Sequence, residues 1–213
     1  IQYFNQVIKI KPYLADPYMY RAIAKIQLGD YQGALTDADE AIERNPFVPQ
    51  AFYVRGFALR KLGKFAEAAK DFSKALEFSP DNLNLLLIRM DALERMEDYQ
   101  GALADLDKYM KMSPKVHILQ YEKGRLQLAM KDTLAAEKSF NRFIELDSTN
   151  SVGWSARALL RMQKNDLEAA YADYSKAIKL NSTYSGDYIN RGIINVQRNR
   201  FREALSDYDY AIK

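Results

Sequence analysis

The residues of this sequence that could do chemistry are charged side chains that return at fixed positions. A row of basic side chains can hold phosphates or acidic peptides, whereas basic and acidic side chains on neighbouring helices can form ion pairs. The basic positions are Arg21, Arg55, Arg89, Lys123, Arg157 and Arg191. The acidic positions are Asp37, Asp71, Asp105, Asp173 and Asp207.

Pairing between these two sets is the favoured interpretation. Each basic residue precedes a column of small residues, interrupted only by Met90, which places it near the expected interior. The only repeat that lacks the Asp has Ser139 and Lys123. A nucleic-acid footprint should instead be clustered and uncompensated in charge. We therefore expect the pairs to act as a structural latch, named here the Arg–Asp latch. Its members are Arg21 with Asp37, Arg55 with Asp71, Arg89 with Asp105, Arg157 with Asp173, and Arg191 with Asp207.

Candidates for catalysis are few, because the sequence has one histidine and no cysteine. His117 follows Ser113-Pro114-Lys115-Val116 at the expected start of a helix, which is typical of a surface or capping residue. The sequence has no phosphate-binding glycine loop, no zinc-ligand spacing and no nucleophile elbow. We expect no catalytic residue, no metal site and no cofactor.

Composition narrows the class of protein. With 213 residues and 48% hydrophobic content, the chain can bury a substantial core. Lys and Arg number 31 and Asp and Glu number 28, so a formal charge of +3 argues against a nucleic-acid partner. Neither a signal-peptide pattern nor an apolar run long enough to span a bilayer is present. The compartment stays unknown, since cytoplasm and periplasm are both compatible with a cysteine-free chain.

Residues of the same kind return every 34 positions, and we call each such set of positions a column. Proline recurs at Pro12, Pro46, Pro80 and Pro114, and alanine at Ala34, Ala68, Ala102, Ala136, Ala170 and Ala204. A self-similar period of this length is typical of solenoid proteins. A column of large apolar residues contains Tyr18, Phe52, Leu86, Trp154 and Tyr188, with Gln120 as the exception.

Each repeat is expected to form two helices. Apolar residues recur at a spacing of three to four on both sides of a turn, as in the repeat where Gly63-Lys64 separates the two stripes. Gly and Asn tolerate the left-handed conformation that closes a helix, and proline cannot continue one. The expected closing residues are Gly29, Gly63, Asn165 and Asn199.

The interval and these columns resemble the tetratricopeptide repeat family. The resemblance implies an all-α, right-handed superhelical solenoid of antiparallel helix pairs with a concave groove. It covers the whole chain: residues 1–14 align with the second helix of a preceding repeat, and six repeats follow at 15–48, 49–82, 83–116, 117–150, 151–184 and 185–213. Both ends fall inside the pattern, so we expect further repeats or another domain in a longer protein.

By this resemblance, the partner-binding groove is the concave side of the first helix of each repeat. This face is apolar with a few charges of both signs, which suits a protein or peptide partner held by aromatic anchors. The predicted groove residues are Met19, Tyr20, Ile23, Tyr53, Phe57, Arg60, Leu87, Asp91, Glu94, Arg95, Tyr121, Glu122, Arg125, Leu159, Met162, Ile189, Asn190 and Ile193. Packing between repeats is the alternative role for several of them.

We therefore expect a non-catalytic scaffold for protein interactions, and three other readings stay open. Related helical-pair repeats bind single-stranded RNA, although the apolar groove argues against base recognition. The repeats could target an enzyme whose catalytic domain lies outside this chain. Exposed ends, such as residues 1–10 or the last repeat, could also stack on a second copy and form a homo-oligomer.

Overall fold

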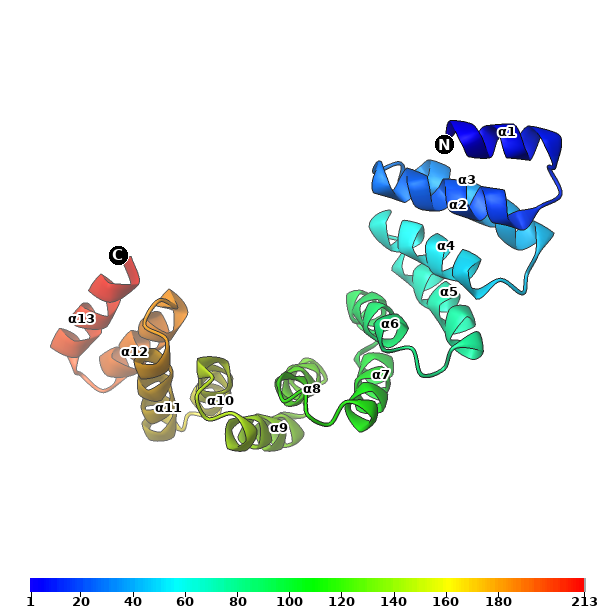
Figure 1. Ribbon diagram of the computed structural model, residues 1–213. Coiled ribbons are helices and arrows are strands. Elements are labelled where there is room, and N and C mark those ends of the chain that lie inside the picture. Colours follow the sequence, from blue (N-terminus) through cyan, green and yellow to red (C-terminus); the bar gives the residue numbers. More distant parts are fainter. Residues whose placement is uncertain (213) are drawn as a thin grey trace. The chain divides into compact units, whose positions relative to one another are not determined.

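A computed structural model describes residues 1–212, which form thirteen helices and no strand (Figure 1). Lys213, the end of the expected sixth repeat, lies outside the described residues. The helices are α1 (Gln2–Ile10), α2 (Ala15–Gln27), α3 (Tyr31–Arg44), α4 (Pro49–Lys61), α5 (Phe65–Phe78), α6 (Leu83–Arg95), α7 (Tyr99–Met112), α8 (Ile118–Ala129), α9 (Thr133–Leu146), α10 (Ser151–Gln163), α11 (Leu167–Leu180), α12 (Ser185–Gln197) and α13 (Phe201–Ile212).

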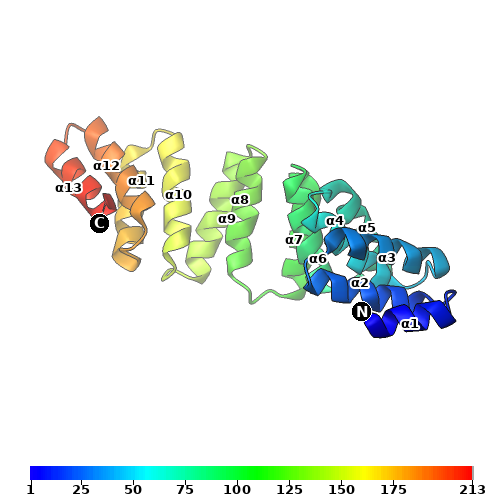
Figure 2. The ribbon, with the colours of Figure 1, turned by 90° about the horizontal axis from the view of Figure 1, so that it is seen from above.

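The chain divides into two compact units, Ile1–Met112 and Ser113–Lys213. In the first unit α1 packs against α2, and the hairpins α2–α3, α4–α5 and α6–α7 stack through α3 on α4 and α5 on α6. In the second unit the hairpins α8–α9, α10–α11 and α12–α13 stack through α9 on α10 and α11 on α12. Figure 2 shows the same hairpins from above. The predicted all-α fold of repeated helix pairs is confirmed.

Each hairpin turn contains one residue in the left-handed conformation. Gly29, Gly63, Asn165 and Asn199 have positive φ, as the sequence indicates. The structure adds Glu97 with φ 62° and Lys131 with φ 63° at the same column of the third and fourth repeats. A side chain with a Cβ is disfavoured there, so these two turns close their hairpins at some cost in stability.

Replacing Lys131 with glycine should therefore stabilise the chain. We expect the free energy of unfolding to rise by about 0.5 to 1 kcal/mol, measured by chemical denaturation, because glycine adopts positive φ without steric cost. Gly63→Ala is the matched control and should destabilise by about 1 kcal/mol. A Cβ added at Gly63 meets no atom within 4 Å, so only the backbone conformation can cause that loss. A lower stability for Lys131→Gly would contradict the assigned conformation.

Small residues in the first helix of a hairpin let the second helix approach closely. A Cβ at Gly56 would lie 2.8 Å from Cε1 of Phe72, and one at Gly124 would lie 2.5 Å from Cε1 of Phe140. Both rings are buried. Close packing of this kind leaves no room for an added carbon, so the small residue limits the distance between the two helices of these hairpins.

The Arg–Asp pairs also lie between the two helices of a hairpin. Nε and Nη2 of Arg55 each donate a hydrogen bond of 2.7 Å to the carboxylate of Asp71. The aspartates of these pairs are buried, and the hydrogen bonding of Arg55 to Asp71 is the main cause that raises the pKa of Arg55. The same paired geometry occurs in Arg21–Asp37, Arg89–Asp105, Arg157–Asp173 and Arg191–Asp207.

Each of these arginines makes one more hydrogen bond, which the sequence analysis did not anticipate. Nη1 of Arg55 donates to Oδ1 of Asp39 on α3, the second helix of the preceding hairpin, at 2.9 Å. One guanidinium group therefore connects two consecutive hairpins as well as the two helices of its own. The equivalent acceptors are Asn5 for Arg21, Ser73 for Arg89, Asn141 for Arg157 and Ser175 for Arg191.

Candidate functional site

The predicted groove residues of α2 differ in their exposure. Met19 is only 5% exposed and packs in the core with Tyr18 and Ala22, so its side chain contributes to packing rather than to an open surface. Tyr20 is exposed, and its ring stacks on Phe4 with centroids 6.1 Å apart. Ile23 is half-buried beside the same core.

On α4 and α6 the predicted residues form an aromatic pair and an ion pair. The rings of Tyr53 and Phe57 lie 6.4 Å apart. Nε of Arg60 lies 2.6 Å from Oδ2 of Asp91, which joins the first helices of two consecutive hairpins, and Arg95 lies 3.8 Å from the same carboxylate. The other predicted residues of this unit are half-buried on α6, namely Leu87 and Glu94. The structure brings these residues together in pairs and small groups.

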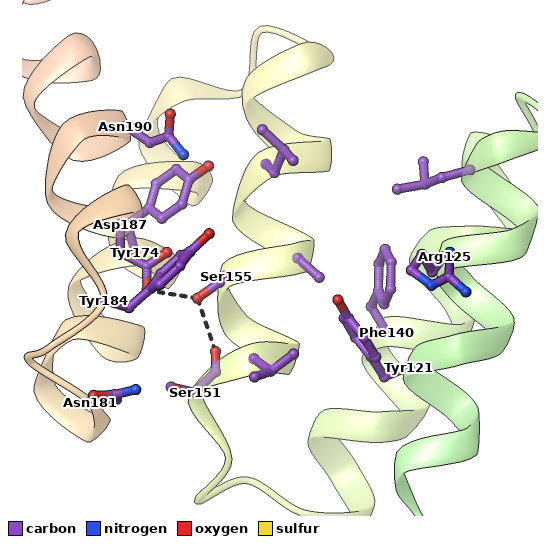
Figure 3. Close-up of a pocket in the computed structure, with 14 residues that line it drawn as sticks. Tyr121, Arg125, Phe140, Ser151, Ser155, Tyr174, Asn181, Tyr184, Asp187 and Asn190 are labelled. Carbon is purple, nitrogen blue, oxygen red and sulfur yellow. Dashed lines mark hydrogen bonds between the residues drawn. The ribbon is translucent and has the colours of Figure 1, made fainter. Parts of the chain in front are cut away.

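The second unit contains a pocket of about 460 Å³, named here the Asp187 pocket. This volume is in the range of about 300 to 1,000 Å³ that is usual for ligand sites. Figure 3 shows two facing walls, with Tyr174, Tyr184 and Asp187 on one and Tyr121, Phe140 and Arg125 on the other. The lining residues are Tyr121, Arg125, Leu128, Phe140, Ser151, Val152, Ser155, Ala156, Leu159, Tyr174, Asn181, Tyr184, Asp187 and Asn190.

The pocket includes Ser155, a small polar residue in a column of large apolar ones. The other members of this column are Met19, Tyr53, Leu87, Tyr121 and Ile189. Ser155 is the smallest of them, so it leaves space between α10 and α12 that a larger side chain would occupy. The small side chain of Ser155 therefore contributes to the space of the pocket.

Asp187 is a second departure from the repeat. Its column otherwise contains Pro17, Ala51, Leu85, Leu119 and Gly153, which have no polar side-chain atom. Asp187 is only 1% exposed. The hydroxyl of Ser155 lies 2.7 Å from Oδ2 of Asp187 and 3.1 Å from the carbonyl oxygen of Ser151 (Figure 3). Since a hydroxyl has one proton, the shorter contact with the charged acceptor is the favoured hydrogen bond.

Burial raises the pKa of Asp187, and the hydrogen bond from Ser155 partly opposes this shift. The carboxylate form is therefore less favourable here than in water. Between the ordinary pKa and the raised pKa, the folded chain holds a proton that the unfolded chain has released. The contribution of this group to the free energy of unfolding consequently falls as pH rises through that interval.

Tyr174 also lines the pocket, and its column contains Ala38, Phe72, Leu106 and Phe140 in the preceding repeats and Tyr208 in the following one. Its side chain is 1% exposed, and its hydroxyl has no hydrogen bond of good geometry among the described residues, although the side chain of Asn190 is close to it. Burial raises the pKa of Tyr174 and the charge of Asp187 adds to the shift, whereas the contact with Asn190 partly opposes it. A buried hydroxyl without a well-formed hydrogen bond is costly, so a polar group of a ligand that bonded to it would remove that cost.

The opposite wall is aromatic with one charged pair. The rings of Tyr121 and Phe140 lie 6.0 Å apart. Nε of Arg125 donates to Oε2 of Glu122 at 2.9 Å, so its charge is compensated on its own helix. Burial is the main cause that raises the pKa of Tyr121, and the charge of Glu122 adds to it. This wall offers apolar surface beside a compensated cation.

Four predicted groove residues line the Asp187 pocket, namely Tyr121, Arg125, Leu159 and Asn190. The remaining predictions of this unit lie elsewhere: Glu122 pairs with Arg125, Met162 packs against the core of α10 and α11, and Ile189 and Ile193 are exposed. Sequence reasoning missed Ser155, Tyr174, Tyr184 and Asp187. A polar residue in an otherwise apolar column is the signal that could have found Asp187, and a small residue in a column of large ones is the signal for Ser155. Tyr174 gives no such signal, because Tyr208 occupies the same column.

In residues 1–212, no group of three or more His, Asp or Glu side chains is arranged to hold a metal ion. Over the same residues, every helix is too short or too polar to cross a bilayer. His117 is exposed before α8 and makes no side-chain cap hydrogen bond.

Comparison with known proteins supports a repeat architecture. A family model described as tetratricopeptide repeat matches residues 21–82 and 89–151, and a second model with the same description matches residues 153–184. Together these matches span most of the sequence. No curated protein matches the sequence.

Solved structures of helical repeats are similar in fold. The C-terminal part of a TPR repeat-containing protein from Cytophaga hutchinsonii is 19% identical with a TM-score of 0.77, and the match covers 99% of this chain and 85% of that one. A tetratricopeptide repeat protein from Parabacteroides merdae is 18% identical with a TM-score of 0.72, covering 91% and 77%. YrrB, described as a TPR protein with an unusual peptide-binding site, is 19% identical with a TM-score of 0.70, covering 92% and 97%.

Proposed function

We propose that this chain, which belongs to the tetratricopeptide repeat family, is a scaffold that holds a segment of a partner protein in the Asp187 pocket and on the adjoining faces of α8, α10 and α12. Repeats of this family are in general non-catalytic and bind proteins, which supports the scaffold role. The observation that carries the finer proposal is the pocket itself, where the polar groups of Ser155, Tyr174 and Asp187 face an aromatic wall.

The size and lining of the pocket support a peptide segment as the ligand. A few polar groups among apolar walls are usual for sites that fix one side chain of a ligand and its orientation. The remaining groove residues offer exposed apolar surface nearby, for example Ile189 and Ile193 on α12. An anchor side chain in the pocket, with weaker contacts around it, is the usual distribution of binding energy in such interfaces.

A substitution that fills the pocket tests this proposal. Peptides that bind the unmodified chain are first selected from a displayed library of short random sequences. Their affinities are then compared between the unmodified chain and Ser155→Tyr. This variant introduces the residue found at Tyr53 and Tyr121 of the same column. We expect affinities at least about tenfold weaker, because an anchor side chain loses its site. The measurement is fluorescence anisotropy of labelled peptides.

Ser206→Tyr is the control, because it makes the same change at an exposed position of α13 outside the pocket lining. It should bind the selected peptides as the unmodified chain does. Peptides that bind Ser155→Tyr with unchanged affinity would place the binding surface elsewhere. Salt-dependent binding of a mixed single-stranded oligonucleotide would instead favour RNA as the ligand.

A further inference from the structure

We infer that the Asp187 pocket selects a basic side chain of the partner, with the cationic group of a lysine or arginine against the carboxylate of Asp187. This inference rests on the proposed function and assigns the chemistry of the anchor. The aliphatic stem of such a side chain would lie against the apolar and aromatic lining, which includes Val152, Leu159 and Tyr184. Basic side chains commonly bury their stems in this way.

Asp187 lacks the basic partner that the other buried aspartates of the described residues have. Six aspartates are buried in residues 1–212, and five of them accept hydrogen bonds from an arginine of the latch. Asp187 is the sixth, and Ser155 is its side-chain donor. A carboxylate removed from water is costly unless a positive charge accompanies it. A basic side chain of a ligand would supply that charge.

The hydroxyl of Tyr174 lies in the same lining as Asp187 and is almost completely buried. The side chain of Asn190 is near enough to influence it, but no described residue makes a hydrogen bond of good geometry with it. An ammonium or guanidinium group has several N–H donors, so one can bind the carboxylate while another reaches a neighbouring hydroxyl oxygen. Two polar groups that are incomplete in the free chain would be satisfied by one ligand group.

The charges and aromatic rings around the pocket also favour a cation. Arg125, the basic residue in the lining, is paired with Glu122, so the charge of Asp187 is the one left uncompensated. Tyr121, Phe140, Tyr174 and Tyr184 surround the space with rings (Figure 3). Faces of aromatic rings attract cations, and this attraction grows as water is removed.

Helix capping does not account for Asp187. It lies in the first turn of α12, where a negative charge is favourable. Asp16 occupies the first turn of α2 in the same way but is exposed to solvent. Since the effect on the helix needs no burial, capping does not explain why Asp187 is placed in a pocket.

The test is a titration of the full chain with five small probes. Binding is monitored by the NMR signals of the Tyr174 and Tyr184 rings. The probes are N-acetyl-lysinamide, N-acetyl-argininamide, N-acetyl-norleucinamide, N-acetyl-glutamic acid amide and alaninamide. We expect the lysine or arginine probe to bind at least about tenfold more tightly than the neutral norleucine probe, because the norleucine probe cannot make the charge-assisted contact. Alaninamide carries only a terminal ammonium group, so it separates that source of positive charge from a side chain.

Asp187→Asn is expected to change probe binding and thermal stability in opposite directions. It should remove the preference for the basic probes and also raise the melting temperature, because an uncompensated charge leaves the interior. A purely structural aspartate would give a lower melting temperature. Asp16→Asn is the matched control, which changes a first-turn aspartate outside the pocket and should leave probe binding unchanged.

The outcomes separate the two proposals. Equal binding of the norleucine and lysine probes, or tighter binding of the glutamic acid probe, would overturn the inference and leave a peptide-binding pocket in place. Tighter binding of alaninamide than of the side-chain probes would overturn it in favour of a chain terminus. If no probe shifts the two tyrosine rings and no displayed peptide is selected, the inference and the proposed function both fail.

Discussion

Replacing Asp71 with alanine is expected to lower the free energy of unfolding by about 3 kcal/mol. Asp71 is buried and accepts two hydrogen bonds from Arg55, which is itself mostly removed from solvent. Removal of the carboxylate leaves the guanidinium group without its main counter-charge in a poorly hydrated position. Chemical denaturation followed by circular dichroism measures the loss.

The matched control uses the other partner of the same arginine. Asp39 accepts a hydrogen bond of 2.9 Å from Arg55, but its side chain is 55% exposed. Water can replace an exposed carboxylate, so Asp39→Ala should cost at most about 1 kcal/mol. Similar small losses for both variants would show that the Arg–Asp latch contributes little to stability.

Replacing Phe72 with alanine is expected to have an effect of the same size or larger, about 3 to 5 kcal/mol. The ring of Phe72 is fully buried and lies against the backbone of α4 at Gly56. Its removal loses the transfer free energy of the ring and leaves a cavity that the two helices cannot close without moving. The loss of stability is measured in the same denaturation experiment.

Phe78→Ala is the control for Phe72→Ala, because both residues lie on α5 and the substitution is the same. Phe78 is 45% exposed, so its truncation should cost about 1 kcal/mol or less. If both substitutions destabilise equally, close packing between α4 and α5 is not what distinguishes the two positions.

The sequence predicts the parts of the fold that repeat. A period of 34 residues with fixed apolar columns predicts the helix pairs, and Gly29 and Gly63 indicate where the first helices end. Glu97 and Lys131 adopt the same left-handed conformation without being glycine or asparagine, because the hairpin geometry overrides their local preference. That override depends on tertiary packing, which residue type alone does not reveal.

The candidate site was less predictable, because it depends on what does not repeat. Tyr121 and Asn190 could be placed on the groove face by their register, but that register also selects Met19, which is buried in the core. Asp187 and Tyr174 lie in columns whose residues are mostly buried between helices, where a ligand site is not sought. Ser155 lies in the same column as the predicted groove residues Tyr53 and Tyr121 but is small and polar. The proximity of Ser155, Tyr174 and Asp187 depends on distances between helices of different hairpins, which the spacing of residues in the sequence does not specify.

The third hydrogen bond of each latch arginine gives each unit a polarity along its length. In the first unit, α6–α7 can detach and take Arg89 with it, which leaves only the hydroxyl of Ser73 to be hydrated. Loss of α2–α3 at the other end would instead leave a donor of Arg55 without Asp39. Because Asp39 is 55% exposed, water can replace it at that donor, so this loss costs at most about 1 kcal/mol. These hydrogen bonds therefore give the hairpins a direction along the unit without strongly protecting either end from fraying.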